Sequence, residues 1–124
     1  MAVTYTTAVK NARLDAVTTA IGTTGVLEIG TAGMSTVLAT IALGNPAAAA
    51  ASGAVLTLAG FPRSDSSADN TGTAAAARIR TASGGSDIIT GLTVGLSAAD
   101  IILDSLSITA GQQVTINTAS ITHA

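Results

Sequence analysis

The hydrophobic period of this chain changes once, at Gly22, and this change limits the folds it can adopt. Before Gly22, Leu14, Val17 and Ile21 recur at the spacing of one helix face. After it, apolar residues alternate with others over short stretches, which is the pattern of half-buried strands. The sequence therefore predicts a mainly β fold, an antiparallel β-sandwich with one N-terminal α-helix.

The helix is predicted over residues 6–21. Thr6 or Thr7 can cap its first turn, and Gly22 follows its last residue, where a left-handed conformation often ends a helix. Small residues form a second strip beside the large apolar ones, and we expect this strip to lie close against a sheet or another subunit. The strip comprises Val9, Ala12, Ala16 and Ala20. Asn11, Asp15 and Thr18 fall on the side away from the apolar residues.

The rest of the chain is predicted to be strands joined by short turns. The strands are expected at 25–30, 36–43, 54–59, 73–81, 88–94, 101–103, 106–109 and 114–121. Residues 83–86 favour a hairpin turn, and the polar segment 63–72 favours a loop. The alanine run 47–51 is interpreted as a loosely packed connection. The chain is expected to be one domain, 1–124, with a helical arm over 1–22 and a β-sandwich over 23–124.

Composition excludes several classes of protein. The chain is 48% hydrophobic and 10% charged, with a mean hydropathy of +0.58, so disorder is not expected. A net charge of −2 with five basic residues gives no electrostatic footprint for nucleic acid. The uncharged segment 29–62 is interrupted by Gly44-Asn45-Pro46, which argues against a membrane-spanning helix. There is no cysteine, which excludes disulfides and thiol chemistry.

No catalytic, cofactor-binding or metal-binding residue is predicted. The single histidine, His123, lies next to the last residue, and we interpret it as a solvated tail residue rather than a member of a catalytic triad. Asp65 and Asp69 are interpreted as turn residues that accept backbone N–H groups, with a weak calcium site as the alternative. The chain is therefore not expected to be an enzyme.

Three features are candidates for contact with a partner. Alternation places Arg78 and Arg80 on one strand face, which is either a solvated face or a docking surface for an acidic partner. Phe61 either closes one end of the sandwich or anchors an interface. The third feature is the small-residue strip that contains Ala12, Ala16 and Ala20. A high apolar fraction in so small a domain also favours a homo-oligomer.

Segments spread along the chain resemble a family of small structural proteins of tailed bacteriophages. They are the run from Ala8 to Val17 that closes on Ala20-Ile21-Gly22, then Leu43-Gly44-Asn45-Pro46, Gly72-Thr73-Ala74 with Arg78-Ile79, and Ile108-Thr109-Ala110-Gly111-Gln112. The resemblance implies a virion component, a head decoration or cement protein with a sandwich or jelly-roll fold and no catalytic residue. It further implies a trimer on the capsid surface, bound to the major capsid protein or another virion protein and made in the host cytoplasm.

Two other functions stay open from the sequence. One is a tail- or fibre-associated virion protein. The other is a module that binds a host surface or carbohydrate, which is disfavoured because Tyr5 and Phe61 are the only aromatic side chains available for stacking on sugars. No membrane or nucleic-acid partner and no cofactor is expected.

Overall fold

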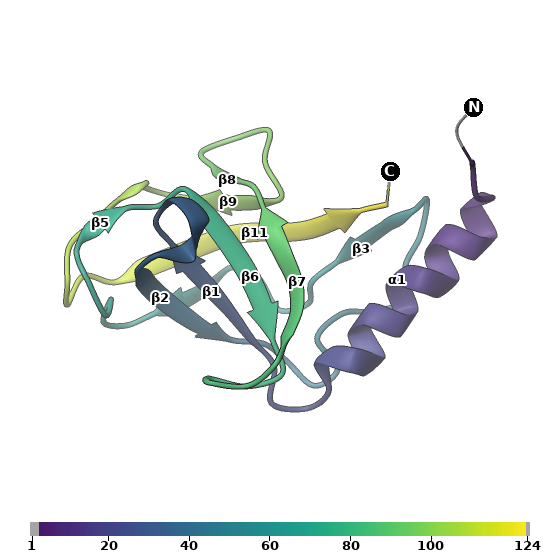
Figure 1. Cartoon of the computed structure of the whole chain (residues 1–124), viewed down its shortest axis with the longest axis horizontal. Coiled ribbons are helices and arrows are strands. Elements are labelled where there is room, and N and C mark those ends of the chain that lie inside the picture. The colour runs from purple at the N-terminus through teal and green to yellow at the C-terminus, as the bar shows by residue number, and fades with distance from the viewer. Residues whose placement is uncertain (1–2, 124) are drawn as a thin grey trace.

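The computed structural model describes residues 3–123, which form one α-helix, one short 3-10 helix and eleven strands (Figure 1). With 40% strand and 15% helix, the mainly β prediction is confirmed. In chain order the elements are α1 Thr7–Ile21, β1 Val26–Gly30, η1 Ala32–Met34, β2 Val37–Ala42, β3 Val55–Thr57, β4 Arg63–Asp65, β5 Gly72–Thr73, β6 Ala76–Arg80, β7 Asp87–Leu92, β8 Val94–Gly95, β9 Ile101–Leu103, β10 Ser107–Ile108 and β11 Val114–Thr122.

The ends of α1 follow the sequence prediction. Thr6 is the N-cap residue, and its Oγ1 accepts a hydrogen bond from the Val9 backbone N–H at 3.4 Å. Gly22 follows the helix with φ +74°, and its N–H donates to the Thr18 carbonyl. Because L-residues rarely adopt positive φ, glycine is the suitable residue for this exit.

The first sheet has the strand order β2-β1-β6-β7, and all its pairs are antiparallel. Its central strand β1 places Leu27 opposite Ile41 on one side and Ile79 on the other. Strands β6 and β7 form the predicted hairpin, which the Thr81 N–H closes by donating to the Ser86 carbonyl. The pairing of β1 with β6 joins segments about fifty residues apart, which local sequence patterns cannot reveal.

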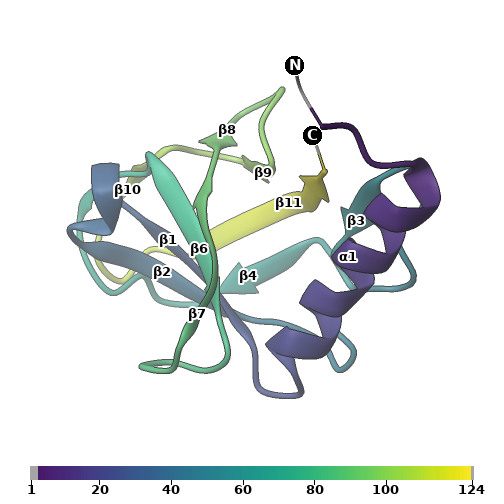
Figure 2. The same cartoon turned by 45° about the vertical axis from the view of Figure 1, so that its right-hand side comes forward.

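The second sheet is organised around β11, which passes behind β6 and β7 in Figures 1 and 2. Strands β3 and β4 lie one after the other along β11, and β9 pairs with it as well. The prediction that 63–72 is entirely loop is wrong, because β4 pairs with β11 and β5 begins at Gly72. Strand β8 pairs with β9 in parallel, and β5 and β10 form a separate two-stranded sheet.

Aliphatic side chains from both sheets and from α1 form one core. Its largest fully buried members are Ile21, Leu27, Ile29, Leu38, Ile41, Leu56, Ile79, Ile101, Leu103, Ile108, Val114 and Ile116. Ala47 and Ala48 are buried in it as well, so the prediction of a loosely packed alanine connection is wrong for them. The small side chains allow close approach, and the Ala59 N–H donates to the Ala47 carbonyl at 2.9 Å.

Both outer edges of the first sheet are poorly suited to further strand pairing. On β2, polar groups of segment 63–70 occupy backbone positions that another strand would use: Thr40 N–H to Asp65 Oδ2, Asp69 N–H to Leu38 O, Asn70 Nδ2 to Val37 O and Arg63 Nη1 to Ala42 O. On β7, the register against β6 shifts twice, which marks bulges. Covered and bulged edges hinder edge-to-edge association.

Gly30 provides a test of the packing around β1. A Cβ at this residue would lie 2.8 Å from Met34 Cε and 2.8 Å from the Thr36 carbonyl oxygen. We expect Gly30→Ala to lower the free energy of unfolding by about 1–3 kcal/mol, because the backbone oxygen cannot easily move away. Urea denaturation measures the loss. Gly72→Ala is the control, since its Cβ meets only the side-chain methyls of Thr31 and Leu38 at 3.1 Å. An equal loss in both variants would contradict this explanation.

Candidate interaction site

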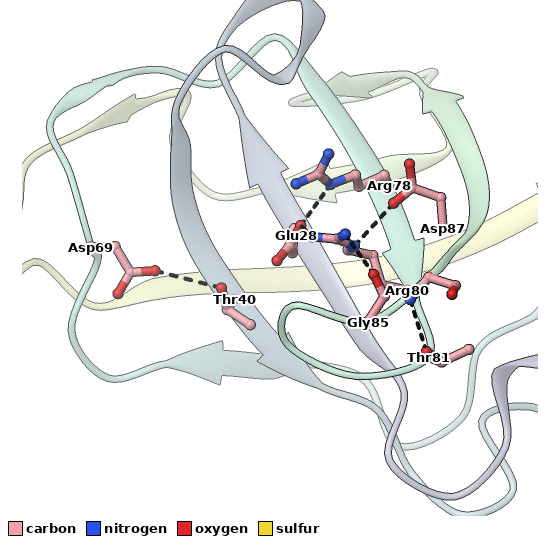
Figure 3. A network of polar contacts seen from close by, with 9 residues as sticks. Glu28, Thr40, Asp69, Arg78, Arg80, Thr81, Gly85 and Asp87 are labelled. Carbon is pink, nitrogen blue, oxygen red and sulfur yellow. Dashed lines mark hydrogen bonds and ion pairs between the residues drawn. The ribbon is translucent and has the colours of Figure 1, made fainter.

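A network of charges crosses the first sheet on the face away from the core (Figure 3). Its centre is Glu28 on β1, whose side chain is only 6% exposed. Arg78 lies opposite Glu28 in the β1–β6 register, and its Nε donates to Glu28 Oε1 at 2.6 Å. Arg80 is the second cation, with Nη1 3.8 Å from the same oxygen. A buried carboxylate is thus balanced by two partly covered guanidinium groups.

Arg80 also holds the hairpin that follows it. Its Nε lies 3.0 Å from Asp87 Oδ1 in an ion pair without hydrogen-bond alignment, and its Nη2 donates to the Gly85 carbonyl at 2.5 Å. The Thr81 hydroxyl oxygen accepts the Ser86 N–H at 3.1 Å inside the same turn. Arg80 therefore connects β1, the 81–86 turn and the start of β7.

The network changes the interpretation of the two arginines. The structure places Arg78 and Arg80 on one face, as predicted, but the solvated-face interpretation is wrong because each is ion-paired and only about one-fifth exposed. Two carboxylates oppose two guanidinium groups, so the cluster carries no net charge. Sequence reasoning missed Glu28 as the partner, because the pairing of β1 with β6 is a tertiary feature.

The orientation of α1 differs from the sequence expectation. Leu14 and Ile21 are buried against the body as predicted. Asn11 and Asp15 also face the body, where their side-chain oxygens accept the backbone N–H groups of Ala54 at 2.9 Å and Ala51 at 2.8 Å. Those N–H groups lie in a turn without a strand partner, and the two side chains supply the acceptors that they otherwise lack within the chain. The polar side of the helix is therefore used for docking.

As a consequence, the small-residue strip points outward. Ala12, Ala16 and Ala20 are exposed, so of the two partners expected for the strip a sheet of the same chain is wrong, and another subunit stays a prediction. Val9, which continues the strip, is 44% exposed. We call Val9, Ala12, Ala16 and Ala20 the outer face of α1.

Most of the large exposed apolar side chains lie in α1 or just before it. Within residues 3–123 there are four: Val3 at 83%, Tyr5 at 44%, Val9 at 44% and Leu96 at 59%. Three of the four belong to the N-terminal segment and the first turn of α1. Arg13 lies over the Tyr5 ring, with its guanidinium carbon 4.5 Å from the centroid. The outer face of α1 and the segment before it thus both expose apolar side chains, and Arg13 lies beside them.

His123 is not a solvated tail residue, and that prediction is wrong. Its backbone N–H donates to the Ala54 carbonyl at 2.9 Å, and its half-buried ring meets Tyr5 edge to face at 6.1 Å between centroids. The extension of β11 along β3 carries His123 onto the body, which a sequence-based argument about fraying termini does not anticipate.

In the polar segment 63–70, the carboxylate of Asp65 accepts hydrogen bonds from backbone N–H groups. Asp65 Oδ2 accepts the Thr40 N–H at 2.9 Å and Oδ1 accepts the Ser67 N–H at 3.0 Å, as predicted for a turn carboxylate. Asp69 Oδ2 lies 3.5 Å from the Thr40 hydroxyl. Among the described residues no group of three or more His, Cys, Asp or Glu is placed to hold a metal ion.

Phe61 is half-buried and packs against the core, while the Arg63 guanidinium carbon lies 5.8 Å from its ring centroid. This position fits the interpretation that Phe61 closes one end of the body. It shares no described contact with Arg78, Arg80 or the outer face of α1, so the structure does not bring the predicted partner residues together into one surface.

Comparison with known proteins adds no relative. The chain matches no protein-family model, and neither the curated proteins nor the solved structures give a significant match. No pocket is found in the described part of the chain. Across residues 3–123, no helix combines the length and hydropathy needed to cross a membrane.

The charge network predicts an asymmetric response to mutation. Arg78→Ala removes the closest partner of buried Glu28, and we expect the free energy of unfolding to fall by about 3 kcal/mol. The double variant Glu28→Leu/Arg78→Leu removes both charges and should be clearly more stable than Arg78→Ala alone. Urea denaturation of the two variants and of Arg13→Ala, a control at an exposed arginine, tests this. An Arg78→Ala protein as stable as Arg13→Ala would contradict the role given to the pair.

Proposed function

We propose that this chain is a non-enzymatic structural protein of a bacteriophage virion, a head decoration or cement protein that binds and stabilises the capsid shell. In this proposal the two main sheets, antiparallel except for the β8–β9 pair, form a jelly-roll-like β-sandwich, and the partner is the major capsid protein or another virion protein. The protein acts as a homo-oligomer, with a trimer as the expected state. The resemblance of the sequence segments to small phage structural proteins supports this family of functions.

The observation that carries the proposal is the apolar surface at the α1 end. Val3, Tyr5 and Val9 are exposed there beside the alanines of the outer face. Contiguous apolar surface on a small protein usually marks an interaction site. Since the edges of the first sheet are covered or bulged, strand addition is a poor alternative for attachment through that sheet.

The free energies of the two kinds of contact favour apolar burial over ion pairs as the basis of attachment. Exposed ion pairs contribute only about 0–1 kcal/mol each, and Arg78 and Arg80 are already paired within the chain. Apolar burial contributes about 25 cal/mol per Å² before the ordering costs of association. Repeated copies on a symmetric shell would add avidity. Attachment is therefore proposed to depend on shape and apolar area, without a metal or cofactor.

The test is addition of purified protein to phage heads that lack it. We expect saturable, stoichiometric binding that changes little between low and moderate salt. Ala16→Glu places a charge on the outer face of α1 and should reduce occupancy at least tenfold. Thr118→Glu, the matched control, places the same charge on an exposed position of β11 and should bind normally.

Two results would contradict the proposal. Failure of the wild-type protein to add to heads would exclude a decoration role. Binding that moderate salt removes, while Ala16→Glu remains bound, would show that attachment is electrostatic and does not use the α1 surface. Circular dichroism of each variant confirms that the fold is retained.

A further inference from the structure

We infer that the turn at residues 52–55 couples the docking of α1 to the docking of the C-terminal end of β11, so that the two elements are held or released together. This coupling operates in the free protein and does not depend on attachment to a phage head. It depends on the backbone conformation of Ala54, on two hydrogen bonds made by that residue, and on a ring contact between the two elements.

Residues 52–55 form a tight turn whose second central residue is strained. Ser52 and Val55 are joined by two backbone hydrogen bonds, each 3.0 Å long. Between them, Gly53 and Ala54 have φ values of +61° and +63°. Two-residue turns with positive φ at both central residues favour glycine or asparagine there. An alanine adopts positive φ only at a cost in free energy, because its Cβ comes too close to the backbone. The surrounding structure must therefore stabilise Ala54 in this conformation.

Ala54 is stabilised from α1 on one side and from the end of β11 on the other. Its N–H donates to Asn11 Oδ1 at 2.9 Å, and its carbonyl accepts the His123 N–H at 2.9 Å. Asp15 adds a second contact from α1, because its Oδ1 accepts the Ala51 N–H at 2.8 Å. In Figures 1 and 2, β3 lies between α1 and the end of β11, so the turn that precedes β3 can contact both. The two backbone groups of one strained residue thus bond to elements that are far apart in the sequence.

The segment before α1 also touches the end of β11 directly. The Tyr5 ring meets the His123 ring edge to face, with the centroids 6.1 Å apart and the ring planes at 78°. Arg13 of α1 lies over Tyr5, and its guanidinium carbon is 4.5 Å from the ring centroid. The position of α1 therefore affects the surroundings of His123 by a second route, through Tyr5.

The strain at Ala54 makes the two hydrogen bonds depend on each other. If α1 leaves the body, the Ala54 N–H loses its acceptor and the residue can relax toward negative φ. That rotation moves the Ala54 carbonyl away from the His123 N–H. If the end of β11 leaves first, the same relaxation moves the Ala54 N–H away from Asn11. Residues in one hydrogen-bond network are energetically coupled, and the coupling is reciprocal. A partner that held α1 in place would therefore also stabilise the end of β11.

Amide hydrogen exchange measured by NMR tests the coupling in one direction. Asn11→Ala removes the acceptor of the Ala54 N–H, and we expect exchange at the His123 N–H to accelerate about tenfold. Exchange at the Ala68 N–H, which donates to a carbonyl just before the start of β11, should stay within about twofold of wild type. Lys10→Ala, the control, changes the preceding residue of α1 and should leave both rates unchanged. An unchanged His123 rate in Asn11→Ala, or equal acceleration at both amides, would overturn the inference.

The reverse direction is tested from the end of β11. His123→Pro removes the N–H that donates to the Ala54 carbonyl, whereas the matched control His123→Ala retains this N–H and loses only the ring. Because the coupling is reciprocal, exchange at the Ala54 N–H should be about tenfold faster in His123→Pro than in His123→Ala. Equal Ala54 rates in the two variants would contradict the coupling.

Replacing the strained residue supplies an independent readout. Ala54→Gly allows the turn to keep positive φ without support from its neighbours. In the Ala54→Gly background, Asn11→Ala should accelerate exchange at the His123 N–H by less than about twofold, instead of about tenfold. The full acceleration in the glycine background would show that the strain at Ala54 does not carry the coupling, and the inference would then be wrong.

Discussion

The contact between Glu28 and Arg78 fixes the arrangement on which the first sheet depends. Strand β1 is paired on both sides, so its register sets which residues of β2 and β6 face the core. A slip of one residue would place Glu28 in the core and turn Leu27 outward, because side chains alternate along a strand. Aliphatic packing alone discriminates weakly between registers in a chain so rich in alanine. A buried carboxylate discriminates strongly between registers, because it needs a guanidinium group opposite it on the neighbouring strand.

The sequence predicts the local structure of this protein well and its long-range contacts poorly. Periodicity, the Thr6 cap and the Gly22 exit are local signals, and each is confirmed for α1. The alternation of β1, β2 and β11 is likewise visible in the chain. Segment 63–72 is beyond such reasoning, because its polar residues pair with β11 and cover the edge of β2. Composition marks it as a loop, and only the neighbouring strands make part of it β.

In the candidate site, too, the sequence predicts the local features and misses the long-range contacts. Alternation along the strand predicts that the two arginines share one face. It does not reveal the ion pairs that give both side chains a structural role. The helical periodicity identifies the small-residue strip, and the strip faces outward because Leu14 and Ile21, on the other side of the helix, are buried against the body. The hydrogen bonds from the backbone of Ala51 and Ala54 add Asn11 and Asp15 to the docked side. Because these donors lie elsewhere in the chain, the sequence of the helix alone does not reveal them.

The position of β11 after all of its partners in the chain has a consequence for synthesis. Strands β3, β4 and β9 all pair with β11, so none of them has this partner until the ribosome has released residues 114–122. While residues 55–113 emerge, these strands therefore have exposed backbone and apolar side chains. Pairings between distant segments also form slowly. A nascent chain of this kind is more exposed to aggregation and more dependent on chaperones than the folded protein, in which the β2 edge is covered and the β7 edge is bulged.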